Sequence, residues 1–296
     1  MGSLTSFSEE LAGIVAAAGP SVVRVEARRR GGASGVVWSA DGIVITSDHV
    51  LERDEEIRVG LPDGTAAAAA LLGRDPGTDL AALKVEATGL AVPKWADPPV
   101  KAGQVVLAVS RPGRATRASF GVVSATADSW RTPAGGRLDH YLESDVRLHP
   151  GFSGSLLVDG AGHALGLNTS GLLRGAGIAI PVATLRRVVP SLVAHGGLRR
   201  GFLGVGTYPV RLPADLGQPS ALLVVSVEPE SPAARAGLLL GDVILSFDDT
   251  TITHPRDLLQ FLEEDRIGRE ARLRIVRAGE TRDVTLSVGF RGASQG

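Results

Sequence analysis

Three short segments carry residue types that together could perform nucleophilic chemistry. His49 follows a run of β-branched residues, Asp79 stands directly before an apolar run, and Ser153 lies in a glycine-flanked loop before a third run. Each has an ordinary interpretation when taken alone: a hydrogen-bonded structural histidine, an acidic turn residue and a loop serine. Their joint occurrence in the order His, Asp, Ser is what indicates catalysis.

The chemistry explains why these residue types belong together. A serine hydroxyl is a poor nucleophile near neutral pH, so it needs a nearby base, and the base needs a buried carboxylate that fixes its tautomer. We therefore predict that Ser153 is the nucleophile, His49 the base and Asp79 the orienting acid. Attack on a carbonyl places negative charge on its oxygen, and we expect the N–H groups of Gly151 and Ser153 to form the oxyanion hole.

Other chemistries fit the sequence less well. The chain has no cysteine, which excludes a cysteine protease and a thiolate metal site. An α/β-hydrolase would need glycine where the chain has Ser155, and it would need the triad in the order Ser, Asp, His. The six histidines show no ligand spacing, so we expect neither a metal nor any other cofactor.

The composition limits which kinds of molecule the protein could bind. The formal charge is -1, from 31 basic and 32 acidic side chains, and there are only three Trp and two Tyr residues. A protein that neutralises many phosphates or stacks bases would differ on both counts, so we expect no nucleic acid partner.

No membrane span is expected either. The apolar residues 11–18 are too few to cross a bilayer, and no basic stretch precedes them as in a secretory leader. The chain as given is therefore expected to be cytoplasmic. It would be periplasmic or otherwise extracytoplasmic if its first three residues replace a removed export signal.

The elements that must position these residues are mainly strands. After a helix that starts near Ser8 and ends at Gly19-Pro20, short β-branched runs alternate with turn signals, which is typical of barrels or a sandwich. The predicted strands comprise residues 22–25, 35–38, 43–46, 57–61, 80–85, 105–109, 121–125, 156–158, 164–168 and 178–181. A helical pattern over residues 182–195 ends at two glycines, and we place a domain boundary there, giving domains 1–195 and 196–296.

The second domain has a different pattern. Strands are predicted at residues 222–227 and 243–248, a hairpin at 272–277 and 284–288, and helices near 231–236 and 255–265.

On these motifs the chain resembles the HtrA (Deg) family of trypsin-like serine proteases with one carboxy-terminal PDZ domain. The protease half is similar in the segments 34–37, 41–46, 78–84, 150–154 and 165–169 and around His49. The resemblance implies a chymotrypsin-like double β-barrel followed by a PDZ domain, a small β-barrel with two helices. It also implies assembly as trimers, for which Phe7 is the candidate contact.

The PDZ resemblance rests on residues 200–205, 231–238 and 241–244. It implies that a peptide carboxy-terminus binds at Phe202, Leu203, Gly204 and Val205 by adding a strand, with an apolar pocket at Leu258 and Leu262.

The implied function is a serine endopeptidase that cleaves unfolded or damaged polypeptides by acyl-enzyme chemistry in protein quality control. The alternative is a weak or inactive relative that acts as a peptide-binding module. It is motivated by Phe152, Ser155 and Leu156, where the family usually has Asn, Gly and Pro, and by Arg147, six residues before Ser153, where such proteases line the specificity pocket.

Overall fold

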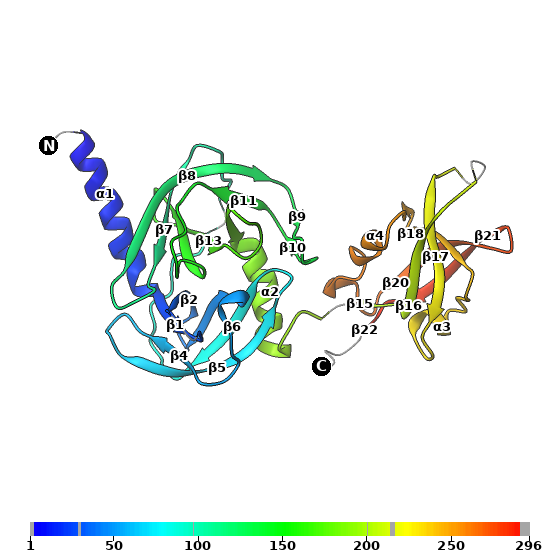
Figure 1. Cartoon of the computed structure of the whole chain (residues 1–296), viewed down its shortest axis with the longest axis horizontal. Coiled ribbons are helices and arrows are strands. Elements are labelled where there is room, and N and C mark those ends of the chain that lie inside the picture. Colours follow the sequence, from blue (N-terminus) through cyan, green and yellow to red (C-terminus); the bar gives the residue numbers. More distant parts are fainter. Residues whose placement is uncertain (1–2, 29–30, 97, 200, 214–216, 291–296) are drawn as a thin grey trace. The chain divides into compact units, whose positions relative to one another are not determined.

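The computed structural model describes residues 3–28, 31–96, 98–199, 201–213 and 217–290. The chain forms two compact units, Met1–Leu198 and Arg199–Gly296. Strands dominate both, as Figure 1 shows. Arg200, the first residue of the PDZ-like motif, lies outside the described residues.

The first unit contains two closed six-stranded barrels. In the first barrel the strand order is β1-β2-β3-β6-β5-β4. Its strands are β1 (Val22–Glu26), β2 (Ala33–Ser39), β3 (Ile43–Ser47), β4 (Ile57–Gly60), β5 (Ala66–Asp75) and β6 (Leu80–Val85). The short 3-10 helix η2 (Asp48–Val50) follows β3.

The second barrel has the order β11-β14-β13-β12-β7-β8. Its strands are β7 (Val105–Ser110), β8 (Arg117–Ala127), β11 (Tyr141–Ser144), β12 (Ser155–Asp159), β13 (Ala164–Thr169) and β14 (Gly177–Pro181). Between β8 and β11 the chain forms a hairpin of β9 (Trp130–Arg131) and β10 (Arg137–Leu138). The expected double β-barrel is therefore confirmed.

Two helices flank the barrels in sequence. Helix α1 (Ser3–Ala18) and the 3-10 helix η1 (Gly19–Ser21) precede β1, and α2 (Val182–His195) follows β14. Helix α2 contacts β5 and β6 of the first barrel and β13 and β14 of the second. Its predicted apolar stripe, Leu185, Val188, Val189 and Leu192, is fully buried. One apolar cluster spans both barrels, where β2 contacts β12 and β3 contacts β13, and each barrel also has an apolar cluster of its own.

In the part that the structure describes, the second unit comprises a six-stranded sheet, a separate two-stranded pair and short helices. The sheet order is β16-β17-β18-β20-β21, with β19 paired to β18, and β15 and β22 form a separate pair. The strands are β15 (Gly201–Phe202), β16 (Val205–Arg211), β17 (Ser220–Val227), β18 (Val243–Phe247), β19 (Thr250–Thr251), β20 (Glu270–Arg277), β21 (Glu280–Ser287) and β22 (Gly289–Phe290). The helices are α3 (Pro232–Arg235), α4 (Pro255–Leu259) and the 3-10 helix η4 (Glu264–Arg266).

Three predicted element boundaries were wrong. Helix α1 begins at Ser3, so Ser8 lies inside the helix and does not start it. The helix expected over residues 255–265 ends at Leu259 and is followed by turns and η4. The strand expected near residues 203–205 begins only at Val205, because Leu203 and Gly204 lie in the connection between β15 and β16.

Candidate active site

Strand register brings His49 and Asp79 together. Strands β3 and β6 pair antiparallel with Ser47 opposite Leu80, so the residue after β3 and the residue before β6 lie side by side. The backbone N–H of Asp48 donates to the carbonyl of Asp79 at 3.1 Å, which continues the ladder by one step. His49 therefore sits on η2 directly over the Asp79 loop.

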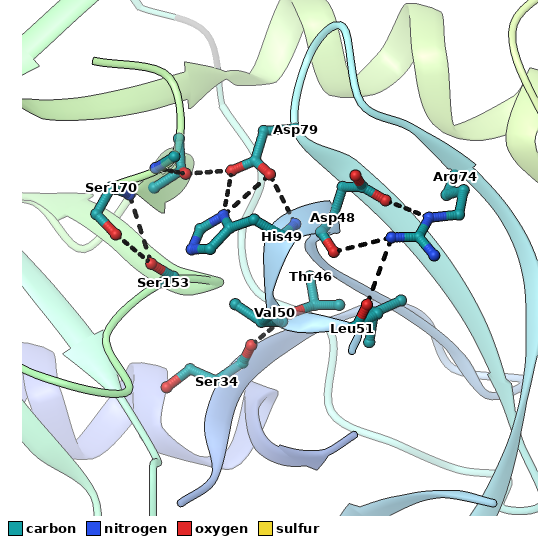
Figure 2. Close-up of polar contacts among 12 residues, drawn as sticks. Ser34, Thr46, Asp48, His49, Val50, Leu51, Arg74, Asp79, Ser153 and Ser170 are labelled. Atoms are coloured by element: carbon teal, nitrogen blue, oxygen red, sulfur yellow. Dashed lines mark hydrogen bonds and ion pairs between the residues drawn. The ribbon is translucent and has the colours of Figure 1, made fainter. Parts of the chain in front are cut away.

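The Asp79 carboxylate holds the imidazole by one ring nitrogen. Nδ1 of His49 lies 3.0 Å from Oδ1 and 2.9 Å from Oδ2 of Asp79, and the backbone N–H of His49 donates to Oδ1 at 2.9 Å. The Asp79 side chain is only 6% exposed. Because Nδ1 is engaged, the other ring nitrogen is left for chemistry, and Figure 2 shows it pointing toward Ser153.

The end of β13 and the local backbone complete the surroundings of Asp79. The Thr169 hydroxyl donates to Oδ2 of Asp79. Asp79 itself has φ +58°, a left-handed backbone conformation that aspartate tolerates better than most residues. Backbone strain of this kind persists only where the surrounding structure enforces it, and here several hydrogen bonds do so.

Ser153 lies just before β12, on the face of the second barrel that meets β2 and β3. Its hydroxyl oxygen is 2.9 Å from the Ser170 hydroxyl oxygen and accepts from the Ser170 N–H at 3.4 Å. Within the described chain no hydrogen bond joins Ser153 to His49. The structure therefore brings His49 and Asp79 into contact, and Ser153 faces them with its hydroxyl engaged elsewhere.

In the loop before Ser153, the peptide group between Gly151 and Phe152 is hydrogen-bonded through both its carbonyl and its N–H. The Gly151 carbonyl accepts from the Ser34 hydroxyl at 2.8 Å, and the Phe152 N–H donates to the His149 carbonyl at 2.9 Å. Gly151 has φ +88°, and a Cβ there would lie 2.4 Å from the Pro112 side chain, so only glycine fits. Neither the Gly151 nor the Ser153 N–H donates to any described residue, which leaves both available to a ligand.

Ser34 connects this loop to the first barrel. Its hydroxyl also accepts the Arg111 N–H at 3.0 Å, and its own N–H donates to the Ser153 carbonyl at 3.1 Å. The buried Arg111 guanidinium donates to the carbonyls of Val22 and Gly19, and burial lowers the pKa of this side chain. The nucleophile loop is thus anchored across the boundary between the barrels.

The turn that carries His49 has its own ionic anchor. Nε of Arg74 donates to Oδ1 of Asp48 at 2.5 Å, as Figure 2 shows. Nη1 of Arg74 donates to Oδ1 of Asp54 at 2.7 Å. Burial disfavours the charge on Arg74, but the hydrogen bonds and attraction from Asp48 and Asp54 outweigh it and raise the pKa of the guanidinium.

Sequence reasoning did not assign roles to Thr169, Ser170, Ser34 or Arg74. Thr169 ends a segment that already resembled the family, so its position was visible, but its carboxylate partner was not. Ser34 likewise begins one of these segments, whereas Ser170 and Arg74 lie outside them. All three have partners that are 17 or more residues away in the chain. No local pattern marks such contacts.

In the second unit the predicted peptide-binding residues run from the end of β15, through the connection, to the start of β16. Phe202 pairs with Gly289, and β16, which starts at Val205, pairs with β17 alone among the described strands. Gly204 has φ +80° and would clash with Ser231 if it carried a side chain. Leu203 is buried in the core, whereas Phe202 and Val205 are partly exposed.

The predicted pocket residues differ from each other. Leu258 of α4 is buried in the core of the unit, and Leu262, beyond the end of α4, is partly buried against that core. Helix α4 contacts β16, so an extended segment beside β16 would meet this helix.

The chain is similar to known proteins in both units. A family described as a trypsin-like peptidase domain matches residues 33–167, and a PDZ domain matches residues 201–288. The solved HtrA-type protease AlgW with a decapeptide superposes with a TM-score of 0.76 at 30% identity, over 95% of this chain and 98% of that one. The chain belongs to the HtrA family.

Other relatives of this HtrA chain agree. The serine endoprotease from Yersinia pestis superposes with a TM-score of 0.74 at 30% identity, over 95% of this chain and 97% of that one. Proteins of Halomonas elongata and Pseudomonas fluorescens, both named "Probable periplasmic serine endoprotease DegP-like", are 36% and 35% identical over 88% and 86% of this chain. The chain spans little more than half the length of these curated relatives, 57% and 56%.

The residues near Ser153 that motivate the peptide-binding alternative are mostly buried in this HtrA chain. Phe152 is 1% exposed and packs in the core of the second barrel, with its ring 5.4 Å from that of His149. Ser155 and Leu156 are fully buried in β12. Arg147 is exposed, and its N–H donates to the Ser119 hydroxyl at 3.0 Å. Three of these four side chains thus lie in the protein interior.

The described residues offer neither a metal cluster nor a membrane-spanning helix. No group of three or more His, Asp or Glu side chains there could hold a metal ion. None of the helices in that part of the chain has the length and apolarity needed to cross a bilayer.

Proposed function

We propose that this HtrA chain is a serine endopeptidase that cleaves unfolded or damaged polypeptides, with His49, Asp79 and Ser153 as its triad. The observation that carries the proposal is the two-point contact of Asp79 with Nδ1 of His49, which leaves Nε2 facing Ser153. The free N–H groups of Gly151 and Ser153 support it, because an oxyanion needs two such donors.

The reaction would proceed through an acyl-enzyme. Nε2 of His49 takes the proton as the Ser153 Oγ–H bond breaks and Oγ bonds to the substrate carbonyl carbon. The carbonyl π electrons move to oxygen, where the N–H groups of Gly151 and Ser153 stabilise the charge. The amine then leaves with the proton from Nε2, and water repeats the sequence on the resulting ester.

Cleavage of unfolded casein tests the proposal. Wild-type protein is expected to degrade casein, and Ser153→Ala is expected to lose about ten thousand- to a million-fold in rate while keeping the same melting temperature. Retained cleavage by pure Ser153→Ala would refute the nucleophile. Absence of cleavage by both, together with peptide binding, would favour the peptide-binding alternative.

The PDZ unit is proposed to recruit the substrate by its carboxy-terminus. An extended peptide would pair with the open edge of β16 at Val205, with its terminal carboxylate at Phe202, Leu203 and Gly204 and its last side chain near Leu258. Hydrophobic carboxy-termini are buried in folded proteins, so this preference would direct the protease to damaged chains. We assign residues 1–195 to the protease domain and 196–296 to the PDZ domain.

The assembly and compartment are proposed from the family. We propose a homotrimer that uses the apolar surface formed by Leu4, Phe7 and Phe120, whose side chains are all exposed in the single chain. The names of the curated relatives favour an extracytoplasmic location over the cytoplasm.

A further inference from the structure

Ser170 is held beside the nucleophile by the end of strand β13. Asn168 accepts the Gly154 N–H through its carbonyl at 2.8 Å, and Thr169 donates to the Asp79 carboxylate. The two residues before Ser170 are therefore tied to the nucleophile loop and to the acid of the triad. Ser170 has little freedom to leave Ser153, and Figure 2 shows the two hydroxyl groups facing each other.

The protons of the two hydroxyl groups can be assigned from their surroundings. Each serine hydroxyl has one proton to donate, and the two oxygens are 2.9 Å apart. Ser153 is only 8% exposed, whereas Ser170 is exposed. If Ser153 donates to Ser170 and Ser170 donates to water, both protons have acceptors. The reverse arrangement would leave the buried hydroxyl without an acceptor among the described residues, which is costly.

We propose that Ser170 is a positioning residue that keeps the Ser153 proton away from His49 until substrate binds. The inference rests on the proposed function, in which Ser153 is the nucleophile. Proton transfer to Nε2 of His49 requires the Ser153 Oγ–H bond to point at the imidazole, so the hydrogen bond to Ser170 must break first. The free enzyme is thereby less reactive than its triad allows.

The test is the rate at which a fluorophosphonate labels the full-length chain. Ser170→Ala removes the competing acceptor, so labelling is expected to become roughly two- to tenfold faster, the factor that corresponds to one net hydrogen bond. The gain is expected in the maximal labelling rate and not in the affinity for the probe. Ser170→Thr keeps a hydroxyl and is expected to react at the slow wild-type rate.

These variants separate the inference from a structural role and from the proposed function. Loss of a merely structural contact would slow labelling and lower the melting temperature, so an unchanged or lower rate in Ser170→Ala overturns the inference. Labelling that persists in Ser153→Ala would overturn the proposed nucleophile, and absence of labelling in every variant would overturn both. Faster labelling of Ser170→Ala that is abolished by adding Ser153→Ala supports both.

Discussion

Gly171 leaves no room for a side chain beside the His49–Asp79 pair. A Cβ at this position would lie 2.6 Å from Nδ1 of His49 and 2.9 Å from Oδ2 of Asp79. We expect Gly171→Ala to displace the imidazole and to lower kcat/KM for a peptide substrate by about a hundredfold, since a shift of about 1 Å has that effect in active sites. Steady-state kinetics on a short fluorogenic peptide provide the measurement.

A glycine elsewhere in the same unit supplies the control. At Gly160 no neighbouring atom lies within 4 Å of the position that a Cβ would take, so Gly160→Ala is expected to keep wild-type kinetics. Equal kinetics for the two alanine variants would show that residue 171 does not support the triad geometry.

At this scale the sequence indicated the reacting groups but not their supports. His49, Asp79 and Ser153 stand out because their types and order match one chemistry. Thr169, Ser170 and Ser34 act through hydroxyl groups whose partners are set by strand pairing between distant segments. Ser34 and Gly151, for example, are 117 residues apart. Such contacts have no local signal.

In the PDZ unit, an ion pair links the β18 start to β20. Both nitrogens Nε and Nη2 of Arg277 donate to the Asp242 carboxylate at 2.7 Å, and the Leu239 N–H donates to it at 2.8 Å. Burial disfavours the charged carboxylate, but these donors outweigh it and hold the pKa of Asp242 below the ordinary value of 3.8.

The lowered pKa of Asp242 makes the stability of the PDZ unit depend on pH. A carboxyl whose pKa is lower in the folded chain stabilises it above the ordinary value of 3.8 and loses this effect as the pH falls below it. We expect Asp242→Asn to lower the free energy of unfolding of the PDZ unit by roughly 1.5–3 kcal/mol at pH 7. The gap to wild type should narrow as the pH falls below 3.8. Calorimetry of the full chain across this range measures it.

Asp283 offers a matched comparison. It pairs with Arg274 at 3.0 Å on the same hairpin, but both side chains are exposed. Asp283→Asn is expected to have a much smaller effect at every pH, because exposed ion pairs contribute little. A pH-independent deficit in Asp242→Asn would contradict the electrostatic account.

Helices and strands could be predicted where the apolar periodicity was strong. They could not be predicted where contacts between distant segments determine the local structure. Helix α2 matches its predicted limits because its apolar stripe and glycine stop coincide. Strand β5 was not predicted, since residues 66–70 are all alanine, the best helix former, yet they pair with β4 and β6. Helix α4 ends early, and the chain beyond it turns so that Phe261 stacks on Phe247 at 4.5 Å.

At the scale of the whole molecule, we propose that the exposed apolar surface at the start of α1 forms the contact between the chains of the trimer. Phe7 is 40% and Phe120 51% exposed, and their rings meet edge to face at 6.2 Å. Light scattering after gel filtration is expected to give three times the chain mass of 30.6 kDa for wild type and a lower mass for Phe7→Ala. Loss of a large apolar contact from each chain accounts for the difference.

Another exposed aromatic residue tests whether the effect is specific. Tyr208 is 64% exposed on β16 of the PDZ unit, and Tyr208→Ala is expected to keep the wild-type mass. A monomeric wild type, or a trimer that survives Phe7→Ala, would remove the proposed role of Phe7.

A crystal structure of the chain after reaction with a fluorophosphonate tests the central claim most directly. We predict phosphorus bonded to Oγ of Ser153, the phosphoryl oxygen accepting from the N–H groups of Gly151 and Ser153, and Nε2 of His49 within hydrogen-bond reach of the adduct. Phosphorus on another residue, or an imidazole of His49 that stays remote from the adduct, would contradict the assignment of this cleft as the active site.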